Sequence, residues 1–175
     1  MNIRHVAIWI GFLLCIGIMQ FQISKLTKNS THHYGIMDFE FAKQDQIPTI
    51  LAEWDRGQVI NCARTNTFID FLFIVFYVMF VIMLSYRRMQ KERFYLLNNL
   101  LRLNFLLIIV AGLLDVAEDI FLLRNIHAFD AGGSYVSTHW IALAKFTLAA
   151  WTVFVWLISL IRSVFSRQAG AIAHR

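Results

Sequence analysis

The sequence predicts an all-α integral membrane protein, a four-helix bundle whose two termini both lie on the cytoplasmic side. Apolar residues make up 58% of the 175 residues and gather into four long runs, whereas an ordinary globular domain is roughly 45 to 50% apolar. Basic residues cluster instead in the short segments that would lie on one side of a membrane. Together these two observations favour four spans with the amino and carboxyl termini inside.

The first predicted span, 6–23, follows a basic residue and is interrupted by only two glycines and two glutamines. A signal peptide starts in a similar way, but no small-x-small cleavage pattern follows this run. We therefore interpret it as an uncleaved helix. Gly11 and Cys15 share one helical face, continued by Ile18 and Gln22, and small residues on such a face let neighbouring helices approach closely.

The segment 24–65 is the only long polar stretch, and we predict that it forms an outer loop. Its second half has the apolar spacing of a short amphipathic helix, with Pro48 suited to the first turn and Gly57 to the end. In 36–41 apolar and acidic residues alternate, which fits both a short strand and an interfacial turn of helix. Such a loop would lie on the membrane or cap the bundle, and a binding lid is the alternative.

The second predicted span, 67–86, carries one acid, Asp70, near its start, and Tyr77 lies on the same helical face. The connection that follows, 87–95, holds four basic residues against the single acid Glu92. By the positive-inside rule this connection is cytoplasmic.

The third predicted span, 96–123, contains three carboxylates, Asp115, Glu118 and Asp119, and is followed by the outer loop 124–137. A central Asp costs about 2.5 to 3.5 kcal/mol on insertion, whereas one Leu or Phe contributes only about 0.3 to 0.6 kcal/mol. The hydrophobicity of this run alone therefore cannot hold it in lipid. Partners on other helices must satisfy the acids.

The fourth predicted span, 138–161, has the most regular pattern in the chain, and the tail 162–175 would be cytoplasmic. Small and polar residues recur along it with heptad spacing, which predicts a face that contacts other helices rather than lipid. The members of this face are Thr138, Ala142, Lys145, Ala149, Thr152, Trp156 and Ser159.

This threading brings charges from three spans to a similar depth in the outer half of the membrane. We expect Asp115 to be the central ligand or proton acceptor, Lys145 its counter-ion, and Asp119 to lie nearer the surface. Four carboxylates against one lysine leave a surplus of negative charge, which suits a proton, a cation or an amine. The candidate ligand- or ion-binding residues are Asp70, Tyr77, Asp115, Glu118, Asp119 and Lys145.

A purely structural cluster is the alternative interpretation. Asp115 and Lys145 would then form an interhelical pair, Asp70 and Glu118 would reach the outer interface, and a basic residue of the outer loops would neutralise the surplus. The basic candidates are Arg64 and Arg124. Buried polar contacts of this kind contribute only about 0.6 kcal/mol each in membrane proteins.

The sequence gives little support for catalysis, a metal or a cofactor. It has no HExxH or ExxH spacing, no phosphate loop and no nucleophile-elbow pattern. Cys15 and Cys62 lack a CxxC partner and are predicted too far apart for a disulfide. The net charge of +5 is divided among the segments that flank apolar runs, which argues against a nucleic-acid partner.

We predict a small polytopic membrane protein that is not an enzyme and acts through helix–helix association. It would be a homo-oligomer, or would dock on another membrane protein through the small-residue faces of the first and fourth spans. The alternatives are a small proton- or cation-linked carrier or ligand-binding protein that uses Asp115 and Lys145, and a membrane enzyme that acts on lipid. The expected surroundings are the lipid bilayer of a bacterial inner membrane.

Overall fold

The computed structural model describes residues 3–29 and 33–172, and this part of the chain is all-helical, without strands. Four helices are long and two are short. The long helices are α1 (Ile3–Asn29), α4 (Ile60–Met89), α5 (Tyr95–Ala131) and α6 (His139–Ile172), and the short ones are α2 (Ile36–Glu40) and α3 (Ile47–Arg56).

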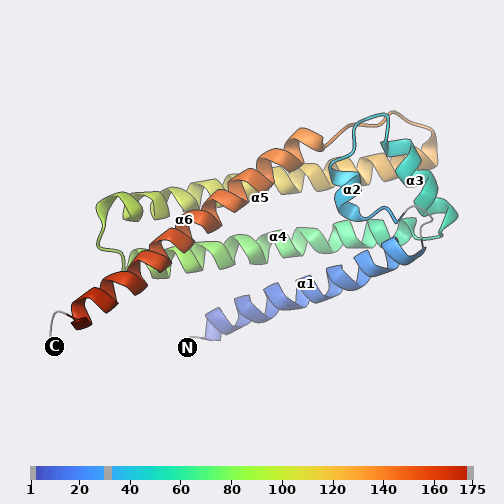
Figure 1. Cartoon of the computed structure of the whole chain (residues 1–175). Helices are drawn as coiled ribbons and strands as arrows, with labels where there is room; N and C mark the ends of the chain where they lie inside the picture. The colour runs from blue at the N-terminus through green and yellow to red at the C-terminus, as the bar shows by residue number, and fades with distance from the viewer. Residues whose placement is uncertain (1–2, 30–32, 173–175) are drawn as a thin grey trace.

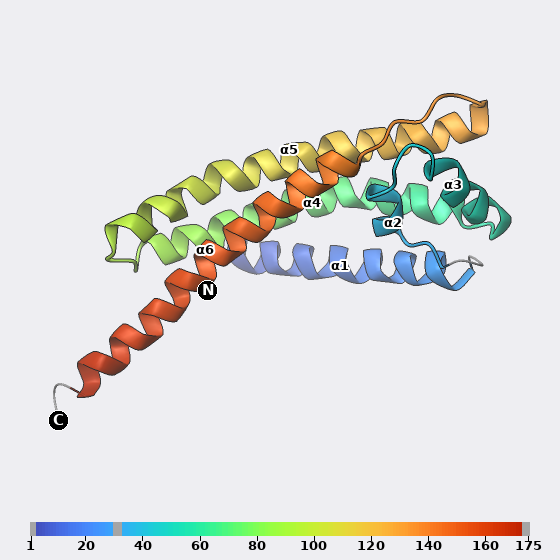
Figure 2. The same ribbon diagram turned by 45° about the horizontal axis from the view of Figure 1, so that its top comes forward.

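The long helices pack as a row in which α1 contacts α4, α4 contacts α5, and α5 contacts α6. One end of the molecule, here the terminal end, is where α1 begins, α6 ends and α4 joins α5 (Figure 1). The opposite end, here the cap end, carries α2, α3 and the connection between α5 and α6. Helix α6 crosses its neighbours obliquely, so that its last turns extend beyond them (Figure 2).

Three helices are long and apolar enough to cross a membrane, over His5–Lys28, Ile60–Met89 and His139–Ser163. The other long helix, α5, has 37 residues and contains the predicted third span, but it carries the three carboxylates. The helices also extend past the predicted spans. Helix α4 begins at Ile60, inside the segment predicted as an outer loop.

The ends of the helices follow local sequence signals. Pro48 lies in the first turn of α3, and Gly57 caps its end, as predicted. The left-handed residue after α3 is Gln58 (φ 54°) rather than the glycine. Helix α5 ends at Gly132, whose φ of 72° is a conformation that glycine adopts without steric cost.

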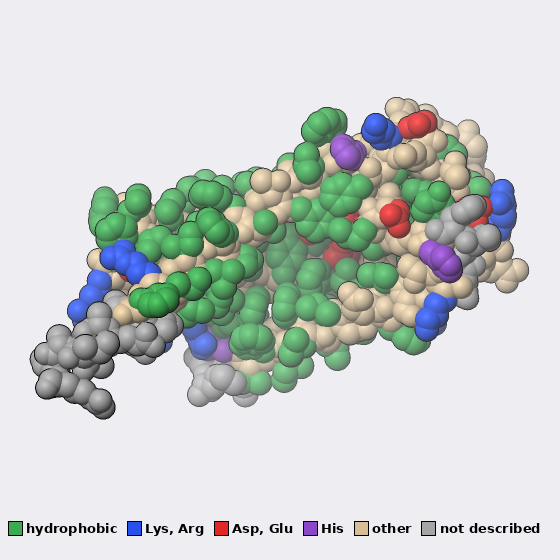
Figure 3. All heavy atoms as spheres, in the orientation of Figure 1, with side chains coloured by type: hydrophobic (Ala, Val, Ile, Leu, Met, Phe, Trp, Pro, Cys, Tyr) green, Lys and Arg blue, Asp and Glu red, His purple; other side chains and the backbone are tan. Residues whose placement is uncertain are grey.

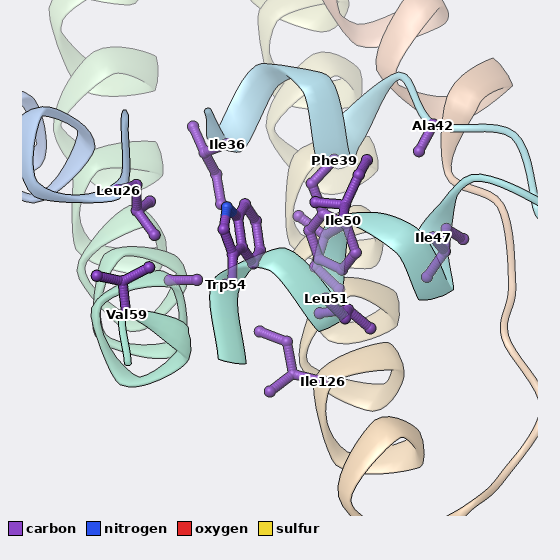
Figure 4. Packing of buried hydrophobic residues seen from close by; sticks show 12 residues of the cluster. Leu26, Ile36, Phe39, Ala42, Ile47, Ile50, Leu51, Trp54, Val59 and Ile126 are labelled. Carbon is purple, nitrogen blue, oxygen red and sulfur yellow. The ribbon is translucent and has the colours of Figure 1, made fainter. Parts of the chain in front are cut away.

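The segment 24–65 caps the long helices with a compact apolar core (Figure 4). Residues 36–40 form the helical turn α2 rather than a strand, and the Asp38 carboxylate accepts the Gly35 N–H at 2.7 Å. Trp54 packs edge-on against Phe39, with ring centroids 5.0 Å apart. The core consists of Leu26, Ile36, Phe39, Ala42, Ile47, Ile50, Leu51, Trp54, Val59, Ala63, Leu122 and Ile126. Both short helices are thereby fixed against α5.

The predicted heptad face of α6 does contact other helices. Five of its members are buried, namely Thr138, Ala142, Lys145, Thr152 and Ser159. On α1, Cys15 is buried and Gly11 leaves room for the Phe76 ring of α4, whereas Ile18 is exposed. The small-residue faces of the first and last long helices are therefore filled, mostly or in part, within the chain.

Candidate functional site

Lys145 of α6 is the centre of a buried cluster of charges near the cap end. Its Nζ lies 2.5 Å from Asp115 Oδ1 on α5 and also forms an ion pair with Glu118, one helical turn further along α5. Helix α2 supplies a third partner, because Glu40 Oε2 lies 3.4 Å from the same Nζ. The structure thus brings Asp115 and Lys145 together, as the depths of their spans predicted.

Glu40 is a member of this cluster that the sequence analysis missed. It lies in the segment predicted as an outer loop, yet only 5% of it is exposed. Burial and the nearby Asp115 raise the pKa of Glu40, and Lys145 opposes the rise. The signal that could have found it was the possible helical turn at 36–41, which places Glu40 one turn after the buried Ile36.

Hydrogen bonds between α2 and the start of α6 hold Glu40 in place. The Thr138 hydroxyl donates to the Glu40 carbonyl oxygen at 2.9 Å, and the Ser137 hydroxyl donates to the Ala42 carbonyl oxygen at 2.8 Å. His139 Nδ1 bonds the Phe41 carbonyl oxygen at 2.9 Å. These polar residues fix the cap to the start of α6.

Asp70 and Tyr77 extend the cluster onto α4. Asp70 is 7% exposed and interacts electrostatically with Asp115, Lys145 and Glu40. The Tyr77 side chain reaches Asp115 because α4 and α5 approach closely at Gly112. A Cβ at that glycine would lie only 2.8 Å from Val78 Cγ2, so a larger residue would push the helices apart.

Two acids of α5 are buried within the protein. Glu118 is fully buried and pairs with Lys145, whereas the structural interpretation expected it to reach an outer interface. Only 1% of Asp119 is exposed, and its greater proximity to the membrane surface stays a prediction. Both residues lie on the side of α5 that the other helices cover, because those helices surround the Asp115 face on both flanks.

The basic residues of the outer loops do not neutralise these acids. Arg64 forms an ion pair with Asp130 at 2.9 Å, on partly exposed side chains. Arg124 is exposed. Lys145 is thus the basic residue that the described part of the chain places against Asp115, Glu118 and Glu40.

Some carboxylate oxygens of the cluster have no donor. Within the residues that the structure describes, Asp119 Oδ2 and Glu118 Oε1 are buried and accept no hydrogen bond. Asp119 interacts electrostatically with Asp70 and Asp115, so its side chain belongs to the same cluster. A buried carboxylate without donors is costly unless it is protonated or bound to a cation.

One face of the molecule has a hollow with acidic side chains at depth. Figure 3 shows this hollow between α1 and α6, with acidic atoms at depth among hydrophobic side chains.

Over the part of the chain that the structure describes, no group of three or more His, Cys, Asp or Glu side chains has the geometry of a metal site.

A second buried polar network lies near the terminal end, and the sequence analysis assigned its residues only to a basic loop and a polar seam. Arg88 of α4 is 7% exposed. It donates from Nε to Ser159 Oγ at 2.7 Å and from a terminal nitrogen to the Ser159 carbonyl oxygen at 2.6 Å. The Ser159 hydroxyl donates to Glu92 at 2.5 Å, and Glu92 also accepts the Phe94 N–H at 3.0 Å.

No protein-family model, curated protein or solved structure shows a significant match to this chain. The class of this protein is therefore described from its own fold and site. Over its described residues it is all-helical, with three helices that are apolar enough for a membrane and a buried cluster of carboxylates around one lysine.

Proposed function

We propose that this protein is a multi-pass membrane protein without enzymatic activity that takes up a proton or a small organic cation at the Lys145 cluster. In this role it would be a small proton- or cation-linked carrier. The observation that carries the proposal is Asp119 Oδ2, which is buried and accepts no hydrogen bond from the described residues. Asp119 is 1% exposed and lies in a cluster where one lysine already has three acidic partners.

The electrostatic argument is one of surplus charge. An ionised carboxylate in a dry interior costs several kcal/mol unless a cation or several donors compensate it. Lys145 contacts Asp115, Glu118 and Glu40, and the electrostatic neighbours of these groups include two further acids, Asp70 and Asp119. The surplus must be carried by protons or by a bound cation, and the exchange of one for the other is the chemistry of a coupled carrier.

The exposed face of α5 supports its assignment as a fourth span. Leu106, Leu113 and Ile120 recur on this face with heptad spacing, and all three are more than half exposed. The acids Asp115, Glu118 and Asp119 of the same helix are buried. A helix with this distribution can lie in a bilayer, because its apolar face meets lipid and its charged face meets protein.

The charges at the two ends support a threading with both termini in the cytoplasm. The connection between α4 and α5 holds Lys91 and Arg93 at the end where α1 begins and α6 ends. At the cap end basic and acidic side chains are mixed, as in the Arg64–Asp130 pair. The positive-inside rule then places the terminal end in the cytoplasm, and a bacterial inner membrane is the location we propose.

The hollow between α1 and α6 suggests how a ligand would arrive. In a membrane this hollow would face lipid, because hydrophobic side chains surround it and the neighbouring helix α1 is largely exposed and apolar. A lipophilic organic cation can enter from the bilayer. The small-residue face of α6 is mostly covered by contacts within the chain, and that of α1 is covered in part, so these faces offer less support to a role in helix–helix association with another protein.

Tetraphenylphosphonium, a lipophilic cation, is a suitable probe of the site. We expect it to bind the purified protein, to bind more tightly as the pH rises, and to lose about tenfold in affinity, or ~1.4 kcal/mol, in Asp119→Asn. The control is Asp130→Asn, which removes the same charge from an exposed pair at the same end. Equal affinities in the two variants, measured by equilibrium dialysis, would refute the proposed function.

A further inference from the structure

A cleft near the terminal end has the composition of an anion-binding site. It has a volume of about 730 Å³ and lies between the end of α4, the connection to α5, and α6. This size falls in the range of roughly 300 to 1,000 Å³ that is typical of small-ligand sites. The charged side chains that line it are Arg88, Lys91, Glu92, Arg93 and Arg162.

The single acid of the cleft is already engaged. Glu92 accepts hydrogen bonds from the Ser159 hydroxyl, the Phe94 N–H and Arg88. Burial raises the pKa of Glu92, but these bonds outweigh burial and bring the pKa below its ordinary value. The carboxylate is therefore ionised and bound to groups in the wall, and it leaves the other cations of the cleft uncompensated.

Three cations of the cleft have no acidic partner among the described residues. In the described residues, Lys91, Arg93 and Arg162 form no ion pair. The guanidinium of Arg162 lies over the Phe94 ring, 3.9 Å from its centroid, which links α6 to the α4–α5 connection. Stacking on a ring leaves the N–H edge of a guanidinium available, and that edge matches the geometry of a phosphate.

We propose that this cleft binds the phosphate headgroup of an anionic membrane lipid. A lipid is favoured over a soluble phosphate because large apolar side chains stand exposed beside the cations. Phe94, Tyr95 and Leu96 are 43%, 80% and 58% exposed, respectively, at the start of α5. Aromatic and apolar residues next to cationic ones are typical of the membrane interface, where acyl chains meet headgroups.

This inference is independent of the function proposed for the Lys145 cluster, which lies at the other end of the molecule. Each could fail without the other. The headgroup cleft needs no particular substrate and no proton uptake. It requires only that the terminal end lie at a membrane surface.

The test compares lipid binding by two single variants that each remove one arginine from the terminal end. Arg162 lines the cleft, whereas Arg87 is exposed on the last turn of α4 and does not. We expect Arg162→Gln to weaken phosphatidylglycerol binding about fivefold, because one basic residue near a membrane surface contributes about 1 kcal/mol. Arg87→Gln should change it less than about twofold, and phosphatidylcholine should bind weakly to every form.

Native mass spectrometry of the detergent-purified protein, titrated with each lipid, measures these affinities. Arg87 is exposed, so Arg87→Gln should keep the melting temperature of the parent protein. Arg162→Gln also loses the stack on Phe94 and should melt slightly lower while it stays folded. Arg93→Gln is a second cleft variant with the same expected loss. Equal losses in Arg87→Gln and Arg162→Gln would show diffuse attraction and overturn the proposal. Displacement of the lipid by an equal concentration of inorganic phosphate would assign the cleft to a soluble anion and overturn it as well.

Discussion

The two buried charged clusters of this protein, one near each end, compensate their charges in different ways. Near the terminal end, Arg88, Glu92 and Ser159 form a closed network in which one cation meets one acid and the hydroxyl joins both. Near the cap end, Lys145 meets several acids, and Asp119 Oδ2 and Glu118 Oε1 accept no hydrogen bond from the residues that the structure describes.

This difference separates a structural network from a candidate site. A buried network with all partners present rigidifies the fold and has little capacity to accept a ligand. A cluster with surplus charge stores free energy that a proton or cation can release. The Arg88 network therefore serves to join α4 to α6, and the Lys145 cluster is the one that we propose binds a ligand.

The largest effect should follow from removal of Lys145, the one cation that the described residues place at the cap-end cluster. Lys145→Met leaves Asp115, Glu118 and Glu40 without their shared partner. Loss of one partner from a buried ion pair costs about 3 to 5 kcal/mol, and we expect a fall of this size in the free energy of unfolding. Thermal and denaturant unfolding in detergent measure it.

The control for this variant is Lys91→Met, which removes an exposed lysine from the α4–α5 connection and should change stability by less than about 0.5 kcal/mol. The double variant Asp115→Leu with Lys145→Leu should recover part of the loss, because it removes both charges of one pair. A Lys145→Met protein as stable as the parent would mean that the acids are already neutral without the lysine.

A smaller loss should follow at the terminal end. Ser159→Ala removes the hydroxyl that connects Arg88 to Glu92, which leaves buried polar groups partly unsatisfied and costs about 1 to 3 kcal/mol. Thr147→Ala is the matched control on the same helix, because its hydroxyl is exposed and bonds only the Leu143 carbonyl oxygen of its own turn. If both variants unfold at the same temperature, the network contributes nothing to the join between α4 and α6.

The smallest effect concerns how stability depends on pH, because Glu40 at the cap end and Glu92 at the terminal end should change it in opposite directions. Burial raises the pKa of Glu40 above its ordinary value of 4.5, so its stabilising contribution is complete below that pH and is lost as the pH rises through the raised pKa. Hydrogen bonds lower the pKa of Glu92 despite its burial, so its contribution is present above 4.5 and is lost as the pH falls through the lowered pKa.

Melting temperatures of Glu40→Gln and Glu92→Gln, measured from below pH 4.5 to neutral pH, test the prediction. Glu40→Gln should melt at the same temperature as the parent in acid and at a higher temperature as the pH rises. The difference in the free energy of unfolding should change by at most about 1.4 kcal/mol per pH unit, the limit for one proton. Glu92→Gln should match the parent in acid and fall below it at neutral pH. Differences from the parent that do not vary with pH would contradict both assignments.

A contact of the buried clusters could be predicted from the sequence only where residues close to each partner indicated it. The Asp115–Lys145 ion pair was predictable, because the helical spacing and the depth of each span are set by nearby residues. The buried partner Glu40 was predictable only in part. A helical turn at 36–41 places it one turn after Ile36, but nothing around it in sequence shows that α2 docks onto α6. The same holds for Arg88, which has the flanking pattern of a solvated loop residue and instead lies buried against Ser159.

The sequence by itself determined the helices, their apolar and polar faces, and the uneven distribution of basic residues between the two ends. These follow from periodicity and composition, which act over a few residues. The tertiary structure alone decided which acids share Lys145, which oxygens lack a donor, and where a cationic cleft opens between α4 and α6. Those features depend on contacts between segments far apart in the chain, and their geometry is set only when the helices pack.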